Sequence, residues 1–192
     1  MSLYGGVGAR SCHGGACWQV GKAMKVMRGC GGLVLYLDFD GVLHHEDVRW
    51  HPRRGVYLNA PPEYSLFQHA PLLVTLLAPH PEVRIVLSTS WVRALGYSRT
   101  VKRLPPELRE RVIGATYHSK MHEMAFAMLP RGVQVLDDVE RRAPRDWLAL
   151  DDDASGWPTE HEHRVLLTDE RLGLSAPGLT DLLASKLREL KD

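Results

Sequence analysis

Two acidic residues, Asp38 and Asp40, stand two positions apart directly after the apolar run Leu33–Leu37. A short apolar run that ends in turn residues indicates a strand buried on both faces. Because side chains alternate along a strand, this spacing predicts that both carboxylates point to one side, just past the C-terminal end. Open α/β sheets bind their ligands at that edge. Two like charges this close need a cation or a shared proton, so the pair predicts a ligand site.

The chemistry open to such carboxylates is phosphoryl transfer. A carboxylate can attack phosphorus and form an acyl phosphate, which divides one difficult displacement into two easier ones. The attack needs a hard cation to offset the repulsion between anions, and Mg²⁺ prefers oxygen ligands. Gly41 follows the acids and allows the backbone to turn sharply without a Cβ in the way.

A second apolar run, Trp147–Leu150, also ends in acids, Asp151, Asp152 and Asp153. It repeats the pattern of the first motif more than a hundred residues later in the chain. Two acidic strand ends are much less often a coincidence than one.

Hydroxyl groups follow a third apolar run, Val83–Leu87, at Ser88, Thr89 and Ser90. Hydroxyls between a strand and the start of a helix are well placed to hold a phosphate oxygen. The alternative is that they only cap the helix expected from Trp91, and the two roles are compatible.

The stretch from Leu33 to Leu43, a hydrophobic strand followed by Asp-Phe-Asp-Gly-Val, resembles the first motif of the haloacid dehalogenase (HAD) superfamily. The resemblance implies that Asp38 is the nucleophile that forms a phosphoaspartate. It also implies that Asp40 is the general acid and base, and that Mg²⁺ is bound between the two.

The remaining motifs of that family also have counterparts. The second motif is a Ser or Thr, here Ser88 with Thr89 beside it. The third is a Lys or Arg, and two residues compete for it: Lys120 follows a strand end, and Arg131 begins the helix before the next strand. The fourth supplies the remaining metal carboxylate, Asp151 with Asp152 as the alternative.

The combination of Asp-Phe-Asp-Gly-Val-Leu, Ser-Thr-Ser-Trp and Trp-Leu-Ala-Leu-Asp-Asp-Asp looks most like the HAD domains of "Swiss army knife" RNA repair proteins. The resemblance implies a Mg²⁺-dependent phosphatase, a phosphoric monoester hydrolase acting on a phosphorylated small molecule, a nucleotide or a nucleic-acid end. Two alternatives belong to other classes, a catalytically inactive HAD-fold binding module and a nucleic-acid-binding accessory protein. The basic stretch at residues 98–111 fits a solvated helical face or a nucleic-acid contact.

The alternation of strand and helix patterns predicts an α/β fold. We expect a Rossmann-like parallel sheet of about five strands with helices on both faces, of the HAD type with a minimal cap. Residues 33–192 are expected to form the HAD-like domain, and residues 43–66 a flap or short hairpin over the crevice, with His44 and His45 lining its mouth. Residues 1–32 are rich in glycine and are expected to be a flexible tail.

Two features of residues 121–142 are expected to be structural. Asp137 and Asp138 imitate a strand end, but Val135, Leu136 and Val139 fit a helix face, which would leave both acids on a solvated surface. The methionines before Leu129 are expected to fill the core.

Bulk properties exclude several classes of protein. A chain of 192 residues with 44% hydrophobic and 24% charged residues suits one soluble domain. A net charge of +1 creates no overall field that would recruit nucleic acid or a membrane. No apolar run approaches the length of a membrane span, and no signal peptide is evident, so the expected location is cytoplasmic. Three cysteines, at positions 12, 17 and 30, argue against a disulfide framework, and their spacing matches no standard zinc finger. The oligomeric state and the natural substrate are not predicted.

Overall fold

The computed structural model describes residues 12–13, 16–17 and 27–190. The strands are β1 (Cys12–His13), β2 (Ala16–Cys17), β3 (Leu33–Leu37), β4 (Val48–His51), β5 (Gly55–Leu58), β6 (Arg84–Leu87), β7 (Val112–Ala115), β8 (Asp146–Asp151) and β9 (Val165–Leu167). The helices are α1 (Ala70–Leu77), α2 (Trp91–Leu95), α3 (Tyr97–Val101), α4 (Pro106–Arg109), α5 (Glu123–Ala127), α6 (Arg131–Arg142) and α7 (Leu179–Glu189). A 3₁₀ helix, η1 (Thr159–Arg164), precedes β9.

Five parallel strands form the central sheet in the order β7-β6-β3-β8-β9. The strand β3 lies in the middle, paired with β6 on one side and β8 on the other. All five of its residues are buried, because neighbouring strands and both layers of helices cover it. The predicted α/β fold with a parallel sheet of about five strands is confirmed.

The side chains of β3 divide between two cores. Leu33, Leu35 and Leu37 belong to one apolar cluster, and Val34 and Tyr36 belong to another on the opposite face. This is the period-two alternation of a strand that is covered on both sides.

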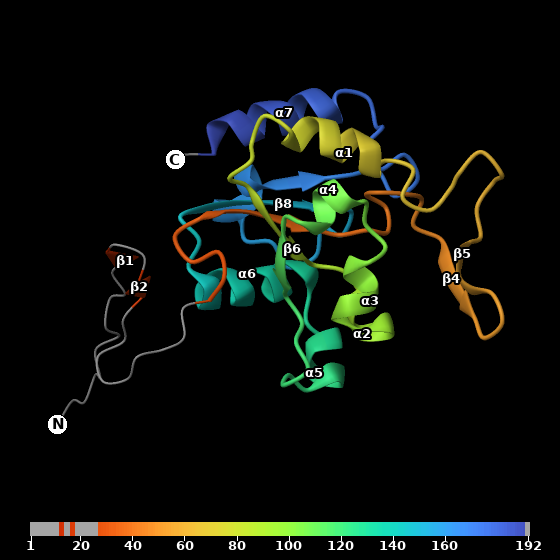
Figure 1. Ribbon diagram of the computed structural model, residues 1–192, viewed down its shortest axis with the longest axis horizontal. Coiled ribbons are helices and arrows are strands. Elements are labelled where there is room, and N and C mark those ends of the chain that lie inside the picture. Colours follow the sequence, from red (N-terminus) through yellow and green to blue (C-terminus); the bar gives the residue numbers. More distant parts are fainter. Residues whose placement is uncertain (1–11, 14–15, 18–26, 191–192) are drawn as a thin grey trace.

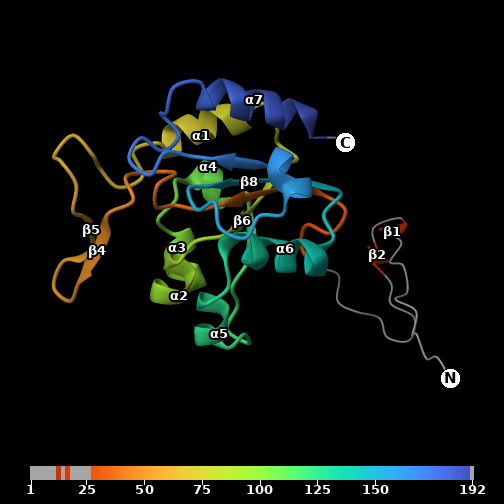
Figure 2. The same cartoon turned by 180° about the vertical axis from the view of Figure 1, so that it is seen from behind.

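Helices from distant parts of the chain cover these two faces. Helices α1 and α7 lie side by side over one face, and α6 lies beneath the other (Figures 1 and 2). Leu73 of α1 and Leu183 of α7 have no exposed surface. Burying one leucine side chain contributes ~1.5–3 kcal/mol, so these contacts hold the layers rigidly around the sheet.

Residues 43–66 contain a short hairpin, β4 paired antiparallel with β5. The hairpin stands out at the side of the sheet (Figure 1). Its Trp50 is largely exposed. That it serves as a flap over the site stays a prediction. The expectation for His44 is wrong: its side chain is fully buried and does not line a mouth.

The predicted flexible tail, residues 1–32, lies mostly outside the described residues. Its last six residues, 27–32, are held against the end of α6, where Arg142 Nη1 donates to the carbonyl of Arg28 and Gly31 N donates to the carbonyl of Ala143 at 2.9 Å. Cys30 is disulfide-bonded, so the argument against disulfides is wrong for this residue. The folded part of the chain therefore begins before the first apolar run.

Two expectations about residues 121–142 need correction. Asp137 and Asp138 lie on the helix α6, as expected, but Asp138 is buried and not solvated. It accepts hydrogen bonds from Tyr36 Oη at 3.0 Å and from Arg142 Nε at 2.7 Å, and such partners allow a charge to stay inside a protein. Met124 and Met128 are exposed, because α5 buries only Phe126.

Within the described residues, no helix combines the length and the apolar character needed to cross a membrane.

Candidate active site

The strand register brings the first, second and fourth sequence motifs to one level of the sheet. Leu37 pairs with Leu87 of β6 and with Leu150 of β8, so the next residue on each strand lies at the same edge. Those residues are Asp38, Ser88 and Asp151. Asp38 N donates to the carbonyl of Leu150 at 3.1 Å, and Ser88 N donates to the carbonyl of Leu37 at 2.8 Å. Segments that are distant in sequence therefore meet at the C-terminal edge.

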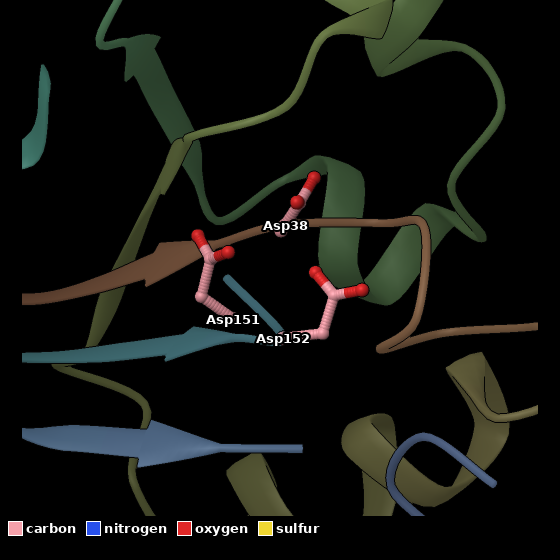
Figure 3. A group of neighbouring side chains, drawn as sticks. All are labelled: Asp38, Asp151 and Asp152. Carbon is pink, nitrogen blue, oxygen red and sulfur yellow. The ribbon is translucent and has the colours of Figure 1, made fainter. Parts of the chain in front are cut away.

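Three carboxylates gather there: Asp38, Asp151 and Asp152 (Figure 3). One oxygen from each lies within 4.8 Å of the others. Asp38 is only 2% exposed and Asp151 only 1%. Buried carboxylates this close repel one another, and oxygen donors in this arrangement fit a hard divalent cation such as Mg²⁺. Both predicted alternatives, Asp151 and Asp152, belong to the group.

The protonation of this group reflects that crowding. Burial raises the pKa of Asp38, against the opposing effect of the Arg131 charge. Burial, followed by the negative charge of Asp38, raises the pKa of Asp151 well above its usual range. The same two causes raise the pKa of Asp152 to about 7. Strongly perturbed groups of this kind concentrate at functional sites.

Arg131 is the cation that the structure places among these acids. Its Nη2 donates to Asp38 Oδ2 at 2.8 Å, and its Nε lies 3.1 Å from Asp151 Oδ2, although that approach lacks hydrogen-bond geometry. Its Nη1 donates to the carbonyl of Ser88. The competing candidate, Lys120, is exposed on the loop after β7 and forms no ion pair with any described acid. The sequence alone could not choose between Lys120 and Arg131, because Lys120 follows a strand and Arg131 begins the helix before the next one.

Hydrogen bonds fix the orientation of the Asp38 carboxylate. Phe39 N donates to its Oδ1 at 2.7 Å, while Arg131 holds Oδ2. The hydroxyl of Thr89, predicted to bind substrate, acts on the same carboxylate and opposes the rise of its pKa. A carboxylate held at both oxygens presents one defined direction to a ligand.

Ser88, the other predicted substrate-binding residue, carries an unpaired polar atom. Its Oγ is buried and has no hydrogen-bond partner within the described chain. A buried hydroxyl without a partner is costly, typically by about 1–3 kcal/mol, so native proteins rarely leave one idle. Oxygen of a bound phosphate would satisfy it.

Asp40 lies apart from the three-carboxylate group. The strand β3 ends at Leu37, and the chain turns at once, with Leu43 N donating to the carbonyl of Phe39 at 2.8 Å. The period-two argument therefore does not extend to Asp40. Instead, Asp40 Oδ1 accepts from Trp91 Nε1 at 2.8 Å and contacts His44 Nε2 at 3.1 Å.

Sequence reasoning missed the part that His44 and Trp91 play in holding Asp40. Phe67 N donates to His44 Nδ1 at 3.3 Å, which leaves the proton of a neutral ring on Nε2, facing Asp40. The only hint in the sequence was that the two residues closely follow the acids of motif one and the hydroxyls of motif two. Nothing in the sequence shows that both rings contact the same carboxylate.

Gly41 is needed for a reason that the sequence did not show. Its φ is +65°, and a Cβ at this position would lie 2.1 Å from Asp152 Oδ2. Only glycine allows the first motif to pass this close to the fourth.

Comparison with known protein families gives a match over most of the chain. A family model described as "HAD domain in Swiss Army Knife RNA repair proteins" matches residues 34–179. Neither a curated protein nor a solved structure matches the chain.

Proposed function

Because the chain belongs to the family of HAD domains in Swiss Army Knife RNA repair proteins, we propose that it is a Mg²⁺-dependent phosphatase acting on the terminal phosphates of RNA or of nucleotides. Membership of the HAD family suggests a phosphatase-type hydrolase. The metal, the residue roles and the substrate are the parts that we propose here.

One observation carries the proposal: a buried carboxylate, Asp38, lies among two further carboxylates and one guanidinium at the ligand-binding edge of the sheet. Folding would not favour such a group for stability alone, because burying like charges is costly. A site that binds a cation through the carboxylates and an anionic substrate through the guanidinium explains why these groups lie together.

The first chemical step uses Asp38 as the nucleophile. A bond forms between its carboxylate oxygen and phosphorus, and the bond from phosphorus to the leaving oxygen breaks. Arg131 neutralises charge on the transferring phosphoryl group, and Ser88 Oγ donates to one of its oxygens. Positioned donors of this kind supply most of the catalysis in phosphoryl transfer.

Asp40 moves the protons. It gives one proton to the leaving oxygen in the first step. In the second step it takes a proton from the water that attacks phosphorus, which breaks the acyl-phosphate bond and releases inorganic phosphate and free Asp38. The indole of Trp91 and the ring of His44 both contact Oδ1 of Asp40, so Oδ2 is the oxygen left for this exchange, with Ser90 Oγ 3.5 Å away.

The carboxylates of Asp38, Asp151 and Asp152 would hold Mg²⁺. When bound, the ion would offset the repulsion between nucleophile and phosphate.

The test is hydrolysis of an aryl phosphate with Mg²⁺ and with EDTA, by the wild type and by Asp38→Asn. We expect turnover only in the wild type with Mg²⁺. Asp137→Asn is the matched control, because it makes the same change on an exposed carboxylate of α6. Turnover by Asp38→Asn equal to that of the control would remove the nucleophile and with it the proposal.

A further inference from the structure

A second hollow, separate from the carboxylate group, lies against the edge strand β7. It encloses about 570 Å³ between β7, the helices α2 and α3, and the loop that follows β7. Gly114 forms part of its floor, where the guanidinium of Arg142 packs 3.1 Å from the position that a Cβ would occupy.

The pocket carries positive charge that no acid among residues 27–190 neutralises. Arg28 and Arg93 line it, and neither forms an ion pair with any residue of the described chain. Arg142 also lines the pocket, but Asp138 neutralises its charge. Arg142 Nε donates to Asp138 Oδ2 at 2.7 Å, and Nη2 donates to Oδ1 at 3.0 Å. The two free guanidinium groups favour an anionic ligand.

Two aromatic rings line the same pocket, Tyr97 at the start of α3 and Tyr117 after β7. Tyr97 is 40% exposed, and Tyr117 is half-buried against Phe126, with ring centroids 5.2 Å apart. Aromatic rings beside arginines are the combination by which proteins stack unpaired bases and hold the adjoining phosphates.

One end of the pocket, at Tyr117, lies at the same edge of the sheet as the candidate active site. Thr116 N donates to the carbonyl of Leu87 at 2.9 Å, so Tyr117 follows at the level of Ser88 and Thr89 on the neighbouring strand. Arg93 lies on α2, which begins one residue after Ser90. Neighbouring strands are about 4.8 Å apart, a separation that adjacent groups of one nucleotide chain can span.

We propose that this pocket binds the nucleotide next to the terminal phosphate of a single-stranded RNA end. The inference rests on the proposed function, because it assigns the part of the substrate that does not react. A base would stack on Tyr97 and Tyr117, and Arg93 and Arg28 would contact the phosphates that follow.

The binding test needs no turnover. It uses fluorescence anisotropy with a short single-stranded RNA, phosphorylated at its 5′ end in one arm and its 3′ end in the other, and with protein carrying Asp38→Asn. We expect Tyr97→Ala to raise the Kd by about tenfold or more in at least one arm, as loss of a stacking ring does. Tyr97→Phe keeps the ring and should stay within about threefold. Arg93→Ala should also weaken binding and make it less dependent on salt.

The matched control for charge is Arg103→Ala, an exposed arginine outside the pocket. It should leave the Kd within about threefold. Equal binding by Tyr97→Ala and Tyr97→Phe, equal loss in Arg103→Ala and Arg93→Ala, or no RNA binding at all would overturn the inference. Thermal melts show that each variant is folded.

A turnover experiment separates this inference from the proposed function. In the catalytically intact protein, Tyr97→Ala should lower kcat/KM for the phosphorylated RNA at least about tenfold more than for an aryl phosphate. A wild type that hydrolyses the aryl phosphate but binds no RNA supports the phosphatase and overturns the pocket. RNA binding that depends on Tyr97, without any phosphatase activity, supports the pocket and overturns the phosphatase.

Discussion

Arg131 Nη2 donates to Asp38 Oδ2 at 2.8 Å, and this bond joins the first residue of α6 to the residue after β3 across 93 positions of the chain. The guanidinium also approaches Asp151, so one side chain touches two of the three clustered carboxylates. It lies where charge would develop during attack on phosphorus.

Arg131→Ala should therefore lower kcat by about 100-fold or more, the usual loss when one donor to the transition state is removed. Lys120→Ala should change kcat by less than about threefold, because Lys120 is exposed and forms no ion pair with any described residue. Steady-state assays of both variants, with circular dichroism to verify folding, provide the measurement. A larger loss in the Lys120 variant would reverse the assignment.

Gly41→Ala should destabilise the protein and weaken the binding of Mg²⁺, because the new Cβ would displace Asp152. Gly55→Ala is the matched control: Gly55 also has a positive φ, of +72°, but a Cβ there meets nothing within 4 Å. Both variants bear the backbone strain of about 1–2 kcal/mol, and only Gly41→Ala adds the clash. Urea denaturation and Mg²⁺ titration compare them, and equal losses would show that the close approach has no effect.

Trp91→Phe removes the indole donor to Asp40 and keeps an aromatic ring in the core. We expect kcat to fall by about 10- to 100-fold, since a hydrogen bond to a charged group contributes about 1.5–3 kcal/mol. Trp50→Phe makes the same substitution on the exposed hairpin and should be nearly neutral. Matching kcat values for the two variants would mean that Asp40 does not need this donor.

The metal-free protein should lose stability as the pH rises through the neutral range. Burial, and then the charge of Asp38, raises the pKa of Asp152 from 3.8 to about 7, so the folded state holds this proton more tightly than the unfolded chain. The stability that this provides is fully present below about pH 3.8 and is lost as the pH approaches about 7.

Mg²⁺ should restore stability at the higher pH, by about 2.7 kcal/mol at 100 times its Kd, because it favours the ionised carboxylates. Thermal melts of the metal-free protein from about pH 5 to about pH 8, with and without Mg²⁺, measure both effects. Asp152→Asn should flatten the dependence on pH. A Tm that does not change across this range in the wild type would contradict the pKa shift.

Local patterns were enough to predict the fold and which strand ends meet at the candidate site. The apolar runs before Asp38, Ser88 and Asp151 identify buried parallel strands, and their ends meet at one edge because parallel strands share a direction. The helix at residues 131–142 could also be predicted, because Val135, Leu136 and Val139 have the spacing of one helix face.

Long-range contacts decided what those patterns left open or suggested wrongly. Asp138 was expected to be exposed to solvent, but its carboxylate is buried. It accepts hydrogen bonds from Tyr36, in the central strand of the sheet, and from Arg142, one turn further along α6. His44 was expected at a mouth, but it packs inside against Phe67 and Trp91.

The amino-acid sequence alone determined which residues end each strand, and so which acids and hydroxyls reach the C-terminal edge of the sheet. Only the tertiary structure decided between Arg131 and Lys120 as the cation beside Asp38, and turned Asp40 toward His44 and Trp91. The physical reason is that strand and helix periodicity depends on near neighbours in the chain. The partner of a charge depends instead on which distant segments pack against it.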